Sequence, residues 1–408
     1  MNQSILVLGR EKNICLAELE SLYPNLTSSY NQELAEINLV ASEINLFNLG
    51  GSIKLAQVIQ KIETKNFNQK TDLINCLQII IENHLNQSSK HKINLGLSFY
   101  GFKISLSKIK KIQFEIKKYL KNKNYAVRFI PNEDLFLSSA QVYHNQLTIN
   151  HNLEIIIGLH QTSKQMVIAQ TSQIQDFNSY TNRDRNRPKR DSRVGMLPPK
   201  LAQIIINLAT ASSTTNHHQI STILDPFCGT GVLLQEALLM NYRVLGSDIS
   251  AKMIDYTSIN LNWIINQEKL PQTNYKLYLA DATTFQWPIK FNYLATETYL
   301  GLAFTNQVQP KIFESNKQTC NLIIKKFLIN LYHQIDQTTG ICLAVPFWTY
   351  NNQDFHLSLI DDLTSIGYNL VKFTLVNGRL VYQRPGQFVG RELLVLKKIN
   401  KKDNYESR

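Results

Sequence analysis

The sequence lacks paired cysteines and long apolar runs. Its five cysteines are scattered, with no C-x-x-C pair, at Cys15, Cys76, Cys228, Cys320 and Cys342. Neither a disulfide framework nor a zinc site is implied by such spacing, so we expect no metal. No apolar segment reaches membrane-spanning length, and no signal-type apolar stretch follows a basic N-terminus. We therefore expect a soluble, cytoplasmic protein that does not contact a membrane.

Acidic residues are also scarce relative to basic ones. The chain of 408 residues has 31 Asp and Glu against 43 Lys and Arg, which gives a formal net charge of +12. This excess favours a polyanionic partner, although it does not constrain the fold. The length exceeds that of one ordinary domain and predicts two or three domains.

The most informative pattern is the stretch Ile223-Leu-Asp-Pro-Phe-Cys-Gly-Thr-Gly231, followed by the apolar run Val232–Met240. It predicts a buried strand, a glycine-rich turn and a helix. Gly229 and Gly231 tolerate positive φ and let a ligand approach the backbone closely. The acid at the strand tip, Asp225, would repel a pyrophosphate. It suits the ammonium, sulfonium and ribose groups of S-adenosylmethionine (SAM).

Two later strands repeat this arrangement of a strand that ends in an acid. Tyr242–Asp248 ends about one βαβ unit after the first acid, where a carboxylate binds ribose hydroxyls. Lys276–Ala282 contains Asp281 near its end. Because ligands of parallel sheets bind at the carboxyl ends of the strands, these acids are expected at one site. The pattern favours SAM over the alternative, a dinucleotide turn for NAD.

The two halves of the chain differ in pattern. The first half alternates short strands and helices without a cofactor motif, which predicts an α+β recognition module. Its strands are expected at 4–8, 45–55, 93–99, 126–129, 153–157 and 166–169, and its helices at 14–22, 71–84 and 112–121. The second half alternates strands and helices up to Leu396, with late strands at 341–346 and 392–397, as in a doubly wound α/β sheet.

Three motifs together resemble one known family. A polar connector carries Arg183, Arg185, Arg187, Arg190 and Arg193; Gly195-Met-Leu-Pro-Pro-Lys-Leu-Ala202 follows it; the glycine-rich turn comes next. This order resembles the tRNA guanine-N2 methyltransferases with an N-terminal THUMP domain, which occur in archaea and eukaryotes and act on the guanosine at position ten. Leu49–Lys54 and Leu137–Ala140 also resemble that family's N-terminal half.

The resemblance implies an architecture and a set of binding residues. It implies a ferredoxin-like segment at 1–65, a THUMP-like RNA-binding domain at 66–170, a basic connector at 171–195 and a Rossmann-like class I SAM methyltransferase domain at 196–399. It implies tRNA as partner and SAM as cofactor, and it identifies no protein partner subunit. The expected cofactor-binding residues are Asp225, Phe227, Cys228, Gly229, Gly231, Asp248, Ile249, Asp281, Ala282 and Pro198.

The fourth strand departs from the family pattern. The family ends this strand with Asp/Asn-Pro-Pro-Tyr/Phe, whereas this chain has Thr296-Glu297-Thr298-Tyr299. A guanine amine is a poor nucleophile, and the usual motif accepts hydrogen bonds from it while the aromatic ring stacks on the flipped base. We expect Glu297 to supply the acceptor and Tyr299 the stacking face, with Thr296 beside them as catalytic residues.

Several alternatives stay open from sequence alone. The lysines between Lys103 and Lys123 form either a solvated face or a phosphate-contacting surface. The connector arginines suit phosphate binding, and Asp184 and Asp191 are expected to pair with them. Besides tRNA guanine-N2 methylation, the motifs allow methylation of ribosomal RNA or of adenine N6. They also allow a non-catalytic RNA-binding protein that retains SAM.

Overall fold

The computed structural model describes residues 2–64, 71–85, 92–149, 151–160, 162–191, 196–211, 220–271, 274–304 and 308–400. Arg193 and Gly195, which belong to the motifs above, lie outside these ranges. The chain divides into two compact units. The first contains Met1–Lys12, Tyr23–Phe47 and Ser52–Asp176, and the second contains Asn13–Leu22, Asn48–Gly51 and Phe177–Arg408. None of the described helices is both long and apolar enough to cross a lipid bilayer.

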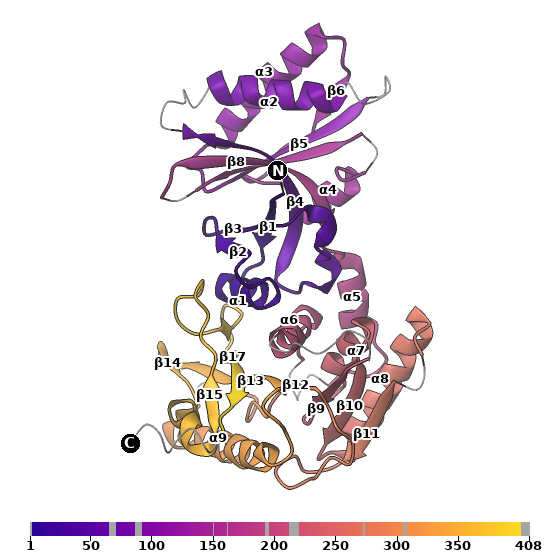
Figure 1. Cartoon of the computed structure of the whole chain (residues 1–408), viewed down its shortest axis with the longest axis vertical. Helices are drawn as coiled ribbons and strands as arrows, with labels where there is room; N and C mark the ends of the chain where they lie inside the picture. Colours follow the sequence, from indigo (N-terminus) through magenta and orange to yellow (C-terminus); the bar gives the residue numbers. More distant parts are fainter. Residues whose placement is uncertain are drawn as a thin grey trace. The chain divides into compact units, whose positions relative to one another are not determined.

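The first unit is built on one eight-stranded sheet with the order β2-β3-β1-β4-β8-β7-β5-β6. Its strands are β1 Ser4–Leu8, β2 Thr27–Ser29, β3 Leu34–Ile37, β4 Ser52–Glu63, β5 Ile93–Tyr100, β6 Val127–Phe129, β7 Leu153–Leu159 and β8 Gln165–Ile174. Its helices are α2 Thr71–Leu85, α3 Leu106–Asn122 and α4 Ser139–His144. Helices α2 and α3 pack side by side against β5, β7 and β8 (Figure 1).

Helix α3 separates apolar and basic residues onto opposite faces. Ile109, Ile112, Ile116 and Leu120 recur at helical spacing and are buried in the core of this unit. The lysines take the remaining positions and are exposed, at Lys108, Lys110, Lys111, Lys117, Lys118 and Lys121. The helix therefore exposes a mainly basic face, on which Phe114 and Glu115 are also exposed, and both interpretations of the lysine-rich segment remain open.

Two of the motifs that carried the family resemblance meet inside the first unit. Lys54 on β4 is buried, and its Nζ donates to the backbone oxygen of Leu137 at 2.7 Å and pairs with Glu154 at 2.5 Å. Ser138, the next residue, caps α4 by accepting from the backbone nitrogen of Gln141 at 3.2 Å. We interpret these contacts as structural, because the buried charge of Lys54 is satisfied by partners within the unit.

The second unit contains a nine-stranded sheet in which β11-β10-β9-β12-β13-β17-β15 are neighbours, β14 pairs with β13 and β16 pairs with β17. Strands β11, β10, β9, β12 and β13 are mutually parallel, and β17 runs antiparallel to β13. The strands are β9 Thr222–Asp225, β10 Arg243–Asp248, β11 Tyr275–Leu279, β12 Tyr293–Glu297, β13 Gly340–Tyr350, β14 Gln353–Phe355, β15 Tyr368–Leu370, β16 Val381–Tyr382 and β17 Val389–Lys398. This is the predicted Rossmann-like, doubly wound architecture.

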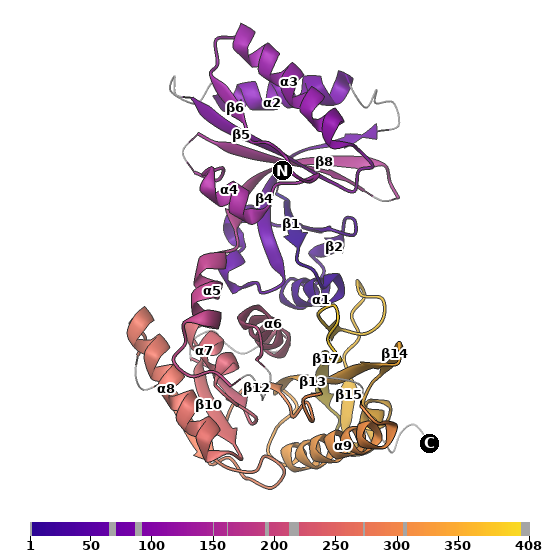
Figure 2. The same ribbon diagram turned by 180° about the vertical axis from the view of Figure 1, so that it is seen from behind.

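Helices cover both faces of this sheet, as Figures 1 and 2 show. They are α5 Phe177–Arg185, α6 Pro199–Thr210, α7 Val232–Leu239, α8 Ala251–Glu268 and α9 Pro310–Tyr332, together with most of α1 Lys12–Leu22. Successive strand residues alternate between the two layers. Ile223 packs with α6, α7 and α8, whereas Leu224 packs with α9. Because helices cover both faces, the central strands β9, β12 and β13 are buried along most of their length.

One predicted strand is wrong. Residues 45–51 do not form a strand; they contain the short 3-10 helix η2 Leu46–Asn48 and a loop, and β4 starts only at Ser52. The physical reason is the buried carboxylate of Glu18 on α1. It accepts from the backbone nitrogens of Gly50 at 2.9 Å and Gly51 at 2.8 Å, which competes with strand pairing. Burial raises the pKa of Glu18 to about 7.

The expected role of the connector arginines also needs correction. The connector folds partly as α5, and Arg183 and Arg187 are only 8% and 3% exposed. Arg183 pairs through Nε with Glu236 on α7 at 2.6 Å. These two guanidinium groups therefore lie in the interior of the second unit and are not available to phosphates. Arg185 and Arg190 are exposed.

Candidate active site

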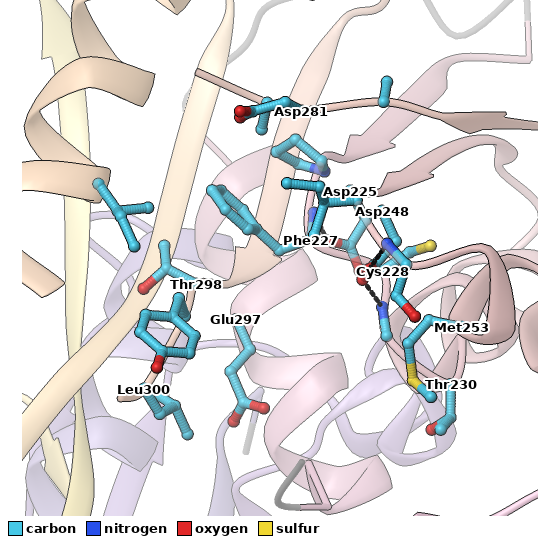
Figure 3. Close-up of a pocket in the computed structure, with 18 of the residues that line it drawn as sticks. Asp225, Phe227, Cys228, Thr230, Asp248, Met253, Asp281, Glu297, Thr298 and Leu300 are labelled. Carbon is cyan, nitrogen blue, oxygen red and sulfur yellow. Dashed lines mark hydrogen bonds between the residues drawn. The ribbon is translucent and has the colours of Figure 1, made fainter. Parts of the chain in front are cut away.

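The parallel strands of the second unit bring the predicted acids to one edge. Asp225 ends β9, Asp248 ends β10, Glu297 ends β12, and Asp281 follows β11 by two residues. A cavity of about 760 Å³ opens at this edge and is lined by all four acids. In Figure 3, Thr298 and Leu300 lie on one side of the cavity, and Asp248, Cys228 and Met253 lie on the other. The carboxyl ends of parallel strands are where such sheets bind ligands.

The glycine-rich loop takes the backbone conformation that its sequence predicts. Gly229 has φ +52° and Gly231 has φ +81°, and the second begins α7 as its N-cap. Helix α8 fixes this loop from behind. Thr257 Oγ1 donates to the backbone oxygen of Gly229 at 2.7 Å, and Asn260 Nδ2 donates to that of Thr230 at 2.8 Å. The loop is thus fixed at the cavity, where Gly229 lets a ligand approach the backbone closely because it has no side chain.

Asp248 is oriented by two backbone amides. Its Oδ2 accepts from Gly229 at 3.0 Å and its Oδ1 accepts from Ser250 at 2.9 Å. A carboxylate has about four lone-pair sites, so capacity remains for the hydroxyls of a ribose. Burial raises the pKa of Asp248. The next residue, Ile249, also lines the cavity and is 73% exposed, which leaves an apolar surface beside the acid.

Asp225 and Asp281 occupy contrasting environments. Asp225 is buried and accepts from Phe227 N at 3.2 Å and from Thr296 Oγ1 at 2.5 Å; burial raises its pKa to about 7. Asp281 is exposed and accepts from both the backbone nitrogen and the hydroxyl of Thr283, each at 2.8 Å. The carboxylate of Asp281 is therefore accessible to a ligand, whereas that of Asp225 links the end of β9 to Phe227 and Thr296.

Glu297 is held by an ion pair that the sequence did not reveal. Arg391 on β17 donates from Nε to Glu297 Oε1 at 2.7 Å, and the two side chains are 9% and 15% exposed. The strand order β12-β13-β17 places them on neighbouring parts of the sheet. Two residues beyond Glu297, Tyr299 also lines the cavity and is 37% exposed. The carboxylate is thus fixed on one oxygen, beside an accessible aromatic ring.

The structure brings together most of the residues expected from the sequence. The expected residues that line the cavity are Asp225, Phe227, Cys228, Gly229, Asp248, Ile249, Asp281, Ala282, Glu297 and Tyr299. Three expected residues are not part of its lining: Gly231, Thr296 and Pro198. Gly231 shapes the loop and Thr296 bonds Asp225. Pro198 is the N-cap of α6, where its oxygen accepts from Ala202 N at 3.0 Å, and the preceding Leu197 lines the cavity instead.

Some lining residues were not expected from the sequence. Asp191 was expected from the sequence only as a partner of connector arginines; in the structure its Oδ2 accepts from Lys252 Nζ on α8 at 2.7 Å. Both residues line the cavity, as do Met253 and Lys326. Arg391, the partner of Glu297, was not among the expected site residues either. Neither pair has a local signal, because its partners are far apart in the sequence.

Two models of known protein families match the chain. The sequence model of the N6/N4 methylases, described as DNA methylases, matches residues 19–259, which is more than half of the chain. The chain belongs to this DNA methylase family. A second model, described as a methyltransferase domain, matches residues 217–381 of this methylase.

Curated relatives carry a more specific name. A tRNA (guanine(10)-N2)-dimethyltransferase of Methanothermobacter thermautotrophicus is 30% identical over 172 residues, which are 42% of this chain and 44% of the relative. One from Pyrococcus abyssi is 36% identical over 117 residues, or 28% of this chain and 31% of the relative. The similarity to tRNA guanine-N2 methyltransferases is confirmed for these segments. Each match spans less than half of the relative's length.

A solved structure shares the overall architecture. TrmN from Thermus thermophilus superposes with a TM-score of 0.53 at 13% identity, and the match covers 97% of this chain and 99% of TrmN. At this identity the comparison shows the fold alone.

The cofactor prediction is confirmed by the family. S-adenosyl-L-methionine is the cofactor of this methyltransferase unit, and NAD is not supported. The cavity residues fit the cofactor in volume and chemistry. Asp248 and Asp281 keep acceptor capacity for hydroxyl and amino groups, Ile249 and Phe227 offer apolar surface, and the glycine loop leaves room for close approach. No phosphate has to be accommodated beside these carboxylates.

Proposed function

We propose that this methylase transfers a methyl group to the exocyclic N2 of a guanosine in tRNA. The observation that carries the proposal is the shared cavity, in which Glu297 and Tyr299 face the same space as Asp248 and Asp281. Groups suited to a base amine thus stand beside groups suited to the cofactor. The names of the curated relatives support the same substrate.

In this proposal the cofactor end of the cavity binds and orients. Asp248 accepts from the ribose hydroxyls, because its two amide contacts hold it in place with lone pairs to spare. Asp281 accepts from the adenine amino group, and Ile249 packs against the adenine ring. The bound cofactor supplies an electrophilic methyl group on its sulfonium.

The residues at the substrate end of the cavity activate the guanine N2 amine as a nucleophile. The lone pair of guanine N2 is delocalised into the ring, so attack needs an acceptor that compensates the charge developing on nitrogen. Glu297 supplies it: Arg391 occupies Oε1, and Oε2 accepts from the amine. Tyr299 stacks on the flipped base. The nitrogen loses its proton after the transfer, so Glu297 need not act as a strong base.

The first unit is proposed to dock the tRNA. The proposal keeps the division implied by the family resemblance: a ferredoxin-like segment over 1–65, a THUMP-like domain over 66–170, a connector over 171–195 and the methyltransferase domain over 196–399. The basic face of α3 is exposed and suits recognition of an RNA helix by its phosphates. A protein that modifies tRNA would work in the cytoplasm, in line with the sequence expectation.

The docking surface can be tested by salt dependence. Replacing Lys110, Lys111, Lys117 and Lys118 by Gln should flatten the slope of log tRNA affinity against log salt concentration, because fewer counterions are released on binding. SAM affinity, measured by calorimetry on the same variant, serves as control and should not change. An unchanged slope would show that α3 is only a solvated face.

A second candidate is methylation of adenine N6, which the family description favours. One experiment separates the two. The purified protein is incubated with SAM and either unmodified tRNA or ribosomal RNA, and the nucleosides are analysed by mass spectrometry. N2-methylguanosine in tRNA is expected, whereas N6-methyladenosine would establish the second candidate. Tight RNA binding without transfer to any RNA would indicate a non-catalytic RNA-binding protein.

A further inference from the structure

A second cavity adjoins the first. It has a volume of about 420 Å³ and is lined by Tyr299 and Leu302 together with residues from the first three turns of α9. Tyr299 lines both cavities, so the second cavity lies next to the proposed site of the target base. Its volume falls within the range of small-ligand sites.

The wall of this cavity holds an amide with an unused donor. Asn316 on α9 is only 4% exposed, and its Oδ1 accepts from the backbone nitrogen of Leu302 at 2.8 Å. Its Nδ2 has no hydrogen-bond partner among the residues that the structure describes. Buried polar groups in proteins are nearly always paired. The unpaired nitrogen therefore indicates that an acceptor group of a ligand completes this site.

The other lining residues define the chemistry of that ligand. Lys311 contributes an exposed ammonium group, and Ser315 and Thr319 contribute hydroxyls. Leu302, Ile312 and the ring of Tyr299 are partly exposed and offer flat apolar surface. None of the described residues that line this cavity carries a carboxylate. The ligand should combine an anionic group, a planar ring and hydrogen-bond acceptors, as a nucleotide does.

We propose that the second cavity binds the nucleotide next to the methylated one in the RNA strand. Lys311 contacts its phosphate, Asn316 Nδ2 donates to its base, and Tyr299 separates it from the target base. The inference rests on the proposed function, because it takes the strand to enter through the first cavity. Enzymes that flip a base commonly read its flanking nucleotides, and this cavity would make methylation depend on the neighbour.

Two substitutions test the cavity with little change in shape. Asn316→Asp keeps the oxygen that accepts from Leu302 and replaces the free donor by an acceptor. Lys311→Gln removes the cation. Each should raise the KM for tRNA about tenfold, with kcat and SAM affinity unchanged. Lys325→Gln is the matched control, since Lys325 lies on the same helix and lines neither cavity. Values of KM within twofold of wild type for both test variants would overturn the proposal.

Abasic substrates sharpen the test. tRNAs that lack the base on either the 5′ or the 3′ side of the methylated nucleotide are compared with intact tRNA. One of them should be a poorer substrate for the wild type by about tenfold, and that loss should shrink in Asn316→Asp. Equal rates on all three substrates would contradict the inference.

A binding measurement keeps the inference independent of turnover. A single-stranded ribo-trinucleotide with a central guanosine is titrated into wild-type protein and the variants. Weaker binding by about tenfold in Asn316→Asp and Lys311→Gln, but not in Lys325→Gln, supports the site even if no methyl transfer is detected. Equal affinity in all four proteins rejects it, even if the wild type methylates tRNA.

Discussion

The two ends of the main cavity are built in different ways. At the cofactor end each acid accepts from a backbone amide two positions later in the sequence: Asp225 from Phe227, Asp248 from Ser250, and Asp281 from Thr283. Asp225 and Asp248 also accept from more distant partners, Thr296 and Gly229. At the substrate end Glu297 is fixed by Arg391, which lies 94 positions later and on another strand.

The difference has consequences for robustness. Contacts between residues two positions apart form as soon as the local turn forms, so each acid at the cofactor end has one support that does not need the rest of the sheet. The ion pair of Glu297 and Arg391 exists only when β13 and β17 are assembled beside β12. Glu297 is therefore the acid held by a side-chain contact that only tertiary packing supplies, and it lies in the part of the cavity that departs from the family motif.

The largest effect is expected from Glu297→Gln. The substitution keeps size and one acceptor oxygen but loses the charge that compensates the developing cation. Removal of one such transition-state interaction typically costs about 10²–10³ in turnover. SAM affinity, measured by calorimetry, should stay the same, because Glu297 lies at the substrate end.

Arg379→Gln is the control for this variant. It breaks the neighbouring ion pair with Glu392, which does not line the cavity, and should leave turnover close to wild type. A melting curve of Glu297→Gln checks that loss of the pair with Arg391 has not unfolded the unit. If Glu297→Gln shows single-turnover rates equal to wild type, Glu297 is only a structural partner of Arg391. The proposed role of its charge in methyl transfer is then wrong.

A pH effect is expected from Asp225 at the cofactor end. Burial raises its pKa to about 7, above the value near 4 of an unfolded chain. The folded state then holds a proton that the unfolded state has lost, so stability falls as pH rises from about 4 through about 7. The slope for one proton is at most about 1.4 kcal/mol per pH unit.

Asp225→Asn isolates this contribution, because Glu18 titrates equally in both proteins. The difference in unfolding free energy, wild type minus variant, should decrease with rising pH and level off above about 7. Urea unfolding between pH 5 and 8 measures it. All three tryptophans, Trp263, Trp287 and Trp348, belong to the second unit, so their fluorescence reports on that unit. A pH-independent difference would show that Asp225 is ionised in the folded protein.

The same contrast explains how far the sequence could predict the structure. The strand–turn–helix at 223–240 and the acids after each strand follow from local pattern, and the structure places them together. The strand expected at 45–51 does not form, because Glu18, some thirty residues earlier, accepts hydrogen bonds from the backbone amides of Gly50 and Gly51. Arg183 was expected at a phosphate but is buried against Glu236. Each miss depends on a partner that only the tertiary fold supplies.

A smaller effect is expected from Asp248→Ala on cofactor binding. Loss of the carboxylate leaves ribose hydroxyls without an acceptor, which costs on the order of 1–3 kcal/mol. Calorimetry should show SAM affinity lower by about one to two orders of magnitude. Asp255→Ala is the matched control, since Asp255 is an exposed acid on α8 that does not line the cavity. Equal SAM affinity in both variants would remove Asp248 from the cofactor site.

The smallest expected difference separates the two loop glycines. Alanine at either position should lower the free energy of unfolding by about 1–2 kcal/mol, because a residue with a Cβ is strained in the left-handed conformation. At Gly231 the added methyl group would also lie 2.9 Å from Thr257 Cγ2, whereas at Gly229 the nearest atom is 3.9 Å away. Gly231→Ala should therefore destabilise the second unit more than Gly229→Ala in urea unfolding followed by tryptophan fluorescence. Adding Thr257→Ser, which removes that methyl carbon and keeps the hydroxyl, should recover part of the loss at Gly231 only. Equal losses at both glycines, or no recovery, would mean that the loop does not depend on its packing against α8 and that the cofactor end is as locally determined as its sequence indicates.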